Sequence, residues 1–158
     1  MEPTTCADRL REHGITLPAP FPSFGSYLMA VRSGHQLFTA GHISAAGDEF
    51  VTGKLGLDLD VEQGRAAARL AARSLLATVQ AELGDLDQVE QFLNVLVTVN
   101  ATPEFTDHTQ VADGASDVFI AVFGDAGRHP RLAVGVSSLP ANAALEVQAV
   151  IAIRSGAT

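Results

Sequence analysis

An arginine and a glutamate near the C-terminal end are the residues of this sequence best suited to chemistry. Arg131 begins the alternating run RLAVGV (131–136), and Glu146 lies in a second run, ALEVQAVIAI (144–153). A guanidinium binds a carboxylate through two parallel, charge-assisted hydrogen bonds, and a carboxylate can accept a proton from water. Together they could hold a small organic acid while water attacks it.

The alternation in both runs predicts β-strands, because successive side chains of a strand point to opposite faces. Leu132, Val134 and Val136 share one face of the first strand, so Arg131 belongs to the other parity; in the second strand, Glu146 lies opposite the most apolar positions. A short connection rich in Ser, Pro and Asn separates the runs, which is typical of an antiparallel hairpin. We therefore expect Arg131 and Glu146 to project from the same, less apolar face of neighbouring strands.

Composition excludes several classes of function. The 158-residue chain has 10 basic and 18 acidic residues and a net charge of −8, which argues against a nucleic-acid partner or an anionic membrane surface. One cysteine and five histidines without metal-ligand spacing give no reason to expect a disulfide, a metal or another cofactor. The N-terminus lacks a hydrophobic signal core and no apolar run reaches membrane-spanning length, so we expect a cytoplasmic protein.

The remaining pattern predicts one domain over residues 1–158, in which 1–20 form a short helix and a proline-rich lead-in. Helical periodicity covers 61–83 and 105–123, although Gly114 weakens the second helix. The expected strands are 27–32, 36–43, an apolar central strand at 92–100, and the two runs described above. This order is typical of an α+β fold, with a single mixed β-sheet and two helices on one face.

The second face of this sheet has no helix left to cover it. Leu96, Ala40, Ala133 and Gly135 are expected to belong to that face. Burial against further copies of the chain is the simplest way to remove such a face from water, and clefts between copies would then be natural ligand sites.

Several short motifs also resemble one known family. Gly25-Ser-Tyr27, Thr39-Ala-Gly41-His, the run 131–136, Leu139-Pro140 and Leu145-Glu146-Val are similar to motifs of the RidA (YjgF) family of reactive-intermediate deaminases. The resemblance spans about residues 20–154. It implies a chorismate-mutase-like fold and a homotrimer with clefts between subunits. It also implies hydrolysis of enamine and imine intermediates to 2-keto acids and ammonia, with a small anionic imino or keto acid as the ligand.

The resemblance assigns roles to individual positions. It implies that Arg131 grips the substrate carboxylate, that Glu146 helps to place the water, and that Tyr27 lines the cleft. The other positions expected to contact substrate are Ala40, Gly41, Ser116 and Ala133. Three of these depart from the family pattern, which has serine, asparagine and cysteine where this chain has Ala40, Ser116 and Ala133. The polar lining is thereby thinner than is usual in the family.

Other interpretations of the same residues remain open. Arg131 could form a purely structural ion pair with Glu146 or Asp125, and Tyr27 could be a packing residue with its hydroxyl bonded to backbone. His42 and His129 could be histidines at loops or strand ends without a chemical task. At the level of function, the alternatives are a non-catalytic trimer that binds small carboxylates or keto acids, or a family member recruited to a different imine or enamine step in a biosynthetic pathway.

Overall fold

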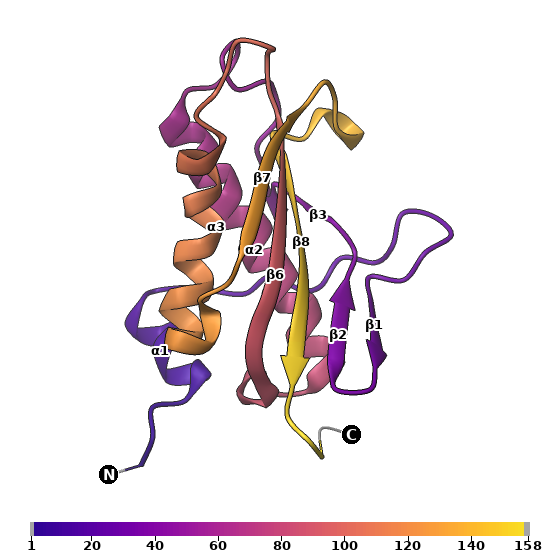
Figure 1. Cartoon of the computed structure of the whole chain (residues 1–158), viewed down its shortest axis with the longest axis vertical. Coiled ribbons are helices and arrows are strands. Elements are labelled where there is room, and N and C mark those ends of the chain that lie inside the picture. The colour runs from indigo at the N-terminus through magenta and orange to yellow at the C-terminus, as the bar shows by residue number, and fades with distance from the viewer. Residues whose placement is uncertain (1, 157–158) are drawn as a thin grey trace.

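The computed structural model of the chain describes residues 2–156. The main sheet has six strands in the order β1-β2-β8-β6-β7, with β3 also paired to β8, and α2 and α3 lie against one face of it (Figure 1). A separate two-stranded ribbon contains β4 (Ala45–Ala46) and β5 (Glu49–Phe50). The main elements are α1 (Cys6–Glu12), β1 (Ala30–Ser33), β2 (Gln36–Thr39), β3 (His42–Ile43), α2 (Val61–Leu83), β6 (Val89–Asn100), α3 (His108–Phe123), β7 (Arg131–Val136) and β8 (Leu145–Ile153).

The helix α2 has the bounds that its periodicity predicts. Asp60 caps its start in a capping box with Gln63, and Gly84 ends it in the left-handed conformation. One face of α2 consists largely of alanine and leucine, and this face is buried against the sheet and α3. Small alanines let the helix approach its neighbours closely, so α2 serves as the rigid support behind β3 and β8.

The helix α3 begins at His108, three residues later than its apolar periodicity predicts. The glycine that weakens the sequence prediction has a structural reason. A Cβ atom at Gly114 would overlap the backbone carbonyl of Arg65 on α2. Gly114 therefore permits the close crossing of α2 and α3, at the expected cost in helix propensity.

The core lies between the sheet and the two long helices. Phe92 on β6 stacks on Phe119 of α3 with ring centroids 4.6 Å apart, and Phe123 lies 5.1 Å away on the next turn of the helix. Val95, Val97 and Val99 of β6 are fully buried on the same side. Each such side chain contributes about 1.5–3 kcal/mol through burial, which fixes β6 as the central strand.

The expected hairpin between β7 and β8 is wrong. β6 lies between them and pairs with β7 in parallel and with β8 in antiparallel. Arg131 is opposite Val95 and Glu146 is opposite Thr98, so the two functional candidates are three residues apart along β6 and project from opposite faces of the sheet. The reason is that Leu132, Val134 and Val136 of β7 face away from the helices, whereas Arg131, Ala133 and Gly135 face toward them. The expectation that Ala133 and Gly135 belong to the uncovered face is therefore wrong.

The sheet face without helices exposes several large apolar side chains. Val31 is 50%, Phe38 is 38% and Leu132 is 58% exposed, and the strand pairing places all three on this face. The fold class is the predicted one, a mixed α+β sheet with two helices on one face. No helix within residues 2–156 is both long and apolar enough to cross a bilayer.

Candidate functional site

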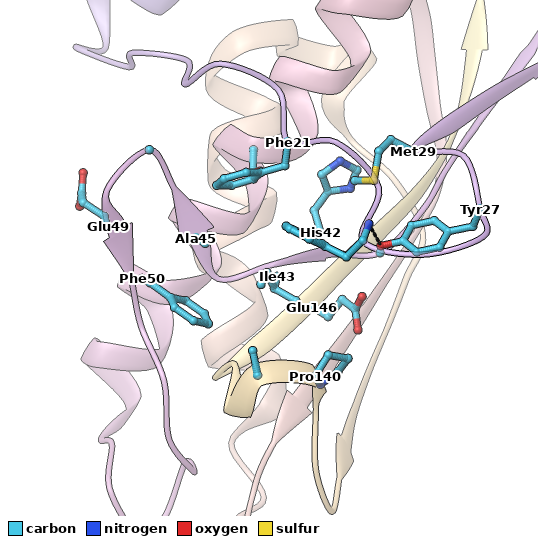
Figure 2. Close-up of a pocket in the computed structure, with 15 residues that line it drawn as sticks. Phe21, Tyr27, Met29, His42, Ile43, Ala45, Glu49, Phe50, Pro140 and Glu146 are labelled. Carbon is cyan, nitrogen blue, oxygen red and sulfur yellow. Dashed lines mark hydrogen bonds between the residues drawn. The ribbon is translucent and has the colours of Figure 1, made fainter.

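A cavity of about 470 Å³ lies beside the start of β8. Its walls come from the proline-rich lead-in and the residues after it up to Met29, the segment 41–50, one residue of α2, the turn before β8, and β8 itself. Figure 2 shows the side chain of Glu146 among those of Tyr27, Ile43 and Pro140, with Phe21 and Phe50 further along the wall. The lining is Phe21, Phe24, Tyr27, Met29, Gly41, His42, Ile43, Ala45, Gly47, Glu49, Phe50, Ser74, Pro140, Ala141 and Glu146.

Glu146 is a half-buried carboxylate in this cavity. A Cβ atom at Gly41 would overlap the Glu146 carboxylate, so the glycine makes the space that this side chain occupies. Burial raises the pKa of Glu146 above the usual glutamate value. Among residues 2–156, no Lys, Arg or His forms an ion pair with it. The carboxylate is therefore held beside an apolar space without a compensating cation.

Tyr27 lines the cavity, and its hydroxyl is bonded to backbone. The Tyr27 hydroxyl accepts a hydrogen bond from the N–H of Phe24 at 3.2 Å (Figure 2). This bond closes the turn 24–27, and Tyr27 also lines the cavity. Cleft lining and a hydroxyl bonded to backbone were alternative interpretations of Tyr27, and the structure shows both.

The predicted binding residues Ala40 and Gly41 have different positions. Gly41 lines the cavity, and Ala40 does not. The Ala40 carbonyl accepts a hydrogen bond from Nδ1 of His42 at 2.9 Å, and its N–H donates to the carbonyl of Met29 at 2.8 Å. Ala40 therefore contributes through its backbone. A serine at this position, as in the family pattern, would leave these two hydrogen bonds unchanged.

His42 lines the cavity but has both ring nitrogens occupied. Its Nδ1 donates to the Ala40 carbonyl, so its Nε2 accepts from the Thr78 hydroxyl on α2 at 2.8 Å. Burial lowers the pKa of His42 to about 4. The ring is thus neutral near physiological pH and ties β3 to α2, which agrees with the interpretation that gave it no chemical task.

Arg131 lies in a different and more open hollow of about 360 Å³, together with Asp113, Ser116 and His129. Its side chain is 15% exposed and forms an ion pair with Asp113 at 2.9 Å. The guanidinium also donates to the Ser116 hydroxyl at 3.0 Å and to the Thr109 carbonyl at 3.2 Å. The expected structural partners of Arg131 were Glu146 or Asp125. Asp113 takes this place.

His129 and Ser116 continue this hydrogen-bond network. Nδ1 of His129 donates to the Gly127 carbonyl at 2.5 Å, so Nε2 accepts from the Ser116 hydroxyl at 2.9 Å. Burial, and the nearby Arg131 charge, lower the pKa of His129. The network fixes the start of β7 against α3.

Sequence reasoning missed Asp113. Asp113 and Ser116 are three residues apart within the predicted helix, which places them on one face, and this spacing is the signal that could have found the pair. Knowing which strand that face would meet requires the tertiary arrangement.

The predicted site residues form two groups within one chain. Tyr27, Gly41 and Glu146 line the larger cavity. Arg131 and Ser116 line the smaller hollow, and Ala133 packs against the core beneath α3. Over the described range 2–156, no group of His, Cys, Asp and Glu could hold a metal ion.

Comparison with known proteins agrees with the fold. The Trypanosoma cruzi protein TCP17 is 42% identical over 151 residues, which cover 94% of each chain. A protein of unknown function from Agrobacterium tumefaciens is 37% identical with a TM-score of 0.88, covering 94% of this chain and 92% of that one. The structure of a putative endoribonuclease from Shewanella oneidensis is 31% identical with a TM-score of 0.91, covering 94% and 99%.

A more distant structure carries a ligand. Escherichia coli TdcF, solved with bound serine, is 26% identical, with a TM-score of 0.60 and coverage of 89% and 96%. The sequence profile of a family described as "YjgF/chorismate mutase-like, putative endoribonuclease" matches residues 7–152. Because this match covers nearly the whole chain, the protein belongs to the YjgF (RidA) family.

Proposed function

We propose that the protein hydrolyses enamine or imine intermediates of the 2-imino acid type to 2-keto acids and ammonia. The observation that carries this proposal is the half-buried Glu146, held in the cavity by the space at Gly41 and without an ion-pair partner among residues 2–156. A carboxylate in this position suits general acid–base chemistry on a small molecule. The resemblance of the motifs around Gly41, Arg131 and Glu146 to those of reactive-intermediate deaminases implies the same class of reaction.

The reaction needs little from the protein. An imine carbon is electrophilic, so water adds to it as the Glu146 carboxylate accepts a proton and the C=N electron pair moves to nitrogen. Glu146 then returns that proton to nitrogen, which gives a carbinolamine. As its C–N bond breaks, the hydroxyl proton passes to the departing nitrogen, so that the C=O bond forms and ammonia leaves. Positioning of the water and the C=N group is the main contribution of the site. The raised pKa of Glu146 brings its proton affinity closer to the working range, since burial disfavours the charged form.

The substrate carboxylate requires a cation that the Glu146 cavity lacks. No Lys or Arg lines that cavity. Arg131 starts the edge strand β7, on the far side of β6 from β8. We therefore propose a homotrimer in which Arg131 of one copy faces the Glu146 cavity of its neighbour. The exposed apolar side chains of the uncovered face support such an assembly. Imines of this kind are released by pyridoxal-phosphate enzymes, so the proposed place of action is the cytoplasm.

A second candidate is a module that binds a small carboxylate without turnover. Arg131 already pairs with Asp113 and Ser116, so a substrate carboxylate must replace Asp113 to reach it. Asp113 is 44% exposed, which keeps the cost of this exchange small. Serine bound to TdcF, a relative, fits a site for small amino-acid-like molecules in either case. A net charge of −8 disfavours binding of RNA, which is a polyanion, and so argues against endoribonuclease activity.

The test measures keto-acid release when an amino-acid oxidase supplies the imine. We expect Glu146→Gln and Arg131→Lys each to lower kcat/KM by about 100-fold or more, since one loses the proton acceptor and the other the bidentate clamp. Arg128→Ala is the matched control, because Arg128 lies beside Arg131 but its ion pair within residues 2–156 is with the exposed Asp125. Unchanged rates in Glu146→Gln would refute the proposal. Binding of a keto acid, lost in Arg131→Lys and without turnover in the native protein, would favour the second candidate.

The stability of Glu146→Gln provides a check on folding. Because the folded-state pKa of Glu146 is raised, the folded protein holds this proton more tightly than the unfolded chain. The free energy of unfolding of the native protein therefore falls as the pH rises above the pKa that Glu146 has in the unfolded chain. Below that pKa, Glu146 does not lower the free energy of unfolding. We expect Glu146→Gln to unfold at a higher temperature than the native protein at pH 7–8, with the difference vanishing in acid.

A further inference from the structure

The Glu146 cavity has a mostly apolar, aromatic wall. Phe21, Phe24, Tyr27 and Phe50 contribute four aromatic rings, and Met29, Ile43 and Pro140 add to them. Phe24 is 73%, Tyr27 is 47% and Phe50 is 45% exposed. Exposed aromatic side chains that cluster around one cavity indicate a binding site more strongly than exposed aromatic side chains scattered over the surface.

The aromatic wall is held in place by the proline-rich segment. The rings of Phe21 and Phe24 lie 6.3 Å apart, and the Phe24 N–H donates to the Tyr27 hydroxyl. Pro20 and Pro22 flank Phe21 and restrict the backbone there. The wall is therefore formed before a ligand enters, so little ordering cost falls on binding.

The polar groups of the cavity are few and mostly occupied. Glu49 pairs with Arg73 at 3.6 Å, and both ring nitrogens of His42 are hydrogen-bonded within the protein. Glu146 remains as the charged lining residue without an ion-pair partner among residues 2–156. A complementary ligand has one reactive or hydrogen-donating group at the Glu146 end and an extended apolar part along the aromatic wall.

We propose that the cavity receives the bulky apolar side chain of the imine, aromatic or branched aliphatic, with its C=N group against Glu146. This inference rests on the proposed function and specifies its substrate class. A three-carbon imino acid would leave Phe21, Phe24 and Phe50 in contact with water. A phenyl or isobutyl group would displace that water and gain affinity from burial. Phe24 and Phe50 then determine specificity, and Glu146 acts on the C=N bond.

The experiment compares imines generated from phenylalanine and leucine with those from alanine and serine. We expect kcat/KM for the larger imines to exceed that for the alanine imine by about 10-fold or more. Phe24→Ala should lower kcat/KM for the phenylalanine imine about 10-fold and lower that for the alanine imine much less. Leu57→Ala is the matched control, because Leu57 is also 73% exposed but lies outside the cavity, and it should change neither value.

The outcomes separate this inference from the proposed function. Equal hydrolysis of all imines, unaffected by Phe24→Ala, would overturn the substrate class and leave the imine chemistry standing. If no imine is hydrolysed, thermal shifts with phenylpyruvate and pyruvate decide the matter. Stabilisation by phenylpyruvate alone, lost in Phe24→Ala, would support the apolar ligand class without the proposed reaction. Equal thermal shifts with the two keto acids, or no shift with either, would overturn the apolar ligand class. It would also be overturned if Phe24→Ala dissociated the assembly without changing the substrate preference.

Discussion

Burial acts in opposite directions on two residues of the same cavity. It raises the pKa of the Glu146 carboxyl and lowers the pKa of His42, because in each case the charged form is the one that loses its hydration. The structural consequences differ, since His42 has hydrogen-bond partners for both nitrogens and Glu146 has no ion-pair partner among residues 2–156. His42 therefore supports the site, and Glu146 is the residue available for chemistry.

His42 should make the protein sensitive to acid. Its pKa is about 4 in the folded protein and 6.5 in the unfolded chain, so both states are neutral above pH 6.5. Below that pH only the unfolded chain takes up the proton, and the free energy of unfolding falls by up to about 3 kcal/mol as the pH reaches 4. Urea unfolding of native protein and His42→Gln between pH 4 and 7 measures this loss.

The variant should lose that part of the pH dependence, whatever its stability at pH 7. His35→Gln is the matched control, because His35 is exposed at the β1–β2 turn. Equal slopes of stability against pH in native protein and His42→Gln would contradict the assignment.

At the scale of elements, glycines set the distance between α3 and its neighbours. Gly114 allows α3 to contact the backbone of α2, and a Cβ atom at Gly135 would come within 2.6 Å of Nε2 of His108. β7 can approach α3 because its helix-facing positions include Ala133 and Gly135. This close approach brings Arg131 to Asp113 and Ser116.

Gly114→Ala should destabilise the protein by about 1–3 kcal/mol, because the added methyl group overlaps a backbone carbonyl that cannot rotate away. Helix propensity alone predicts the opposite sign, a gain of up to about 1 kcal/mol. Thermal or urea unfolding therefore gives a clear answer. Thr109→Ala, at an exposed position of the same helix, serves as the control and should be nearly neutral. A stabilised Gly114→Ala would mean that the helices cross less closely.

At the scale of the whole molecule, the uncovered sheet face and the separation of Arg131 from Glu146 lead to the same expectation. Arg131 and Glu146 lie in different cavities of one chain, so a joint role requires a second copy. The exposed Val31, Phe38 and Leu132 give that copy an apolar surface to bury. A complete site and a covered sheet would thus arise in the same assembly step.

Leu132→Glu should break this assembly. Light scattering should give a mass three times the 16.5 kDa of one chain for the native protein, and that of one chain for the variant. Loss of imine hydrolysis should accompany dissociation. Leu57→Glu places the same charge on a loop residue of comparable exposure and should leave the trimer intact. A native protein that is monomeric at micromolar concentration would contradict the shared site.

Local patterns in the sequence were sufficient for the presence of the helices and for the bounds of α2, but not for the start of α3. The bounds of α2 and the apolar character of β6 follow from neighbouring residues, because capping and periodicity act over a few positions. The family and its fold were also evident from short motifs that surround Gly41, Arg131 and Glu146.

The tertiary structure alone decided how the site is divided. Alternation tells which residues of a strand share a face, but it does not tell which strand lies beside it or which face the helices cover. In β7 the larger side chains, including Leu132, face away from the helices, so Arg131 and Glu146 project from opposite sides of the sheet. That choice depends on the packing of α3 against Gly135 and on β6 lying between the two strands, and both are long-range contacts.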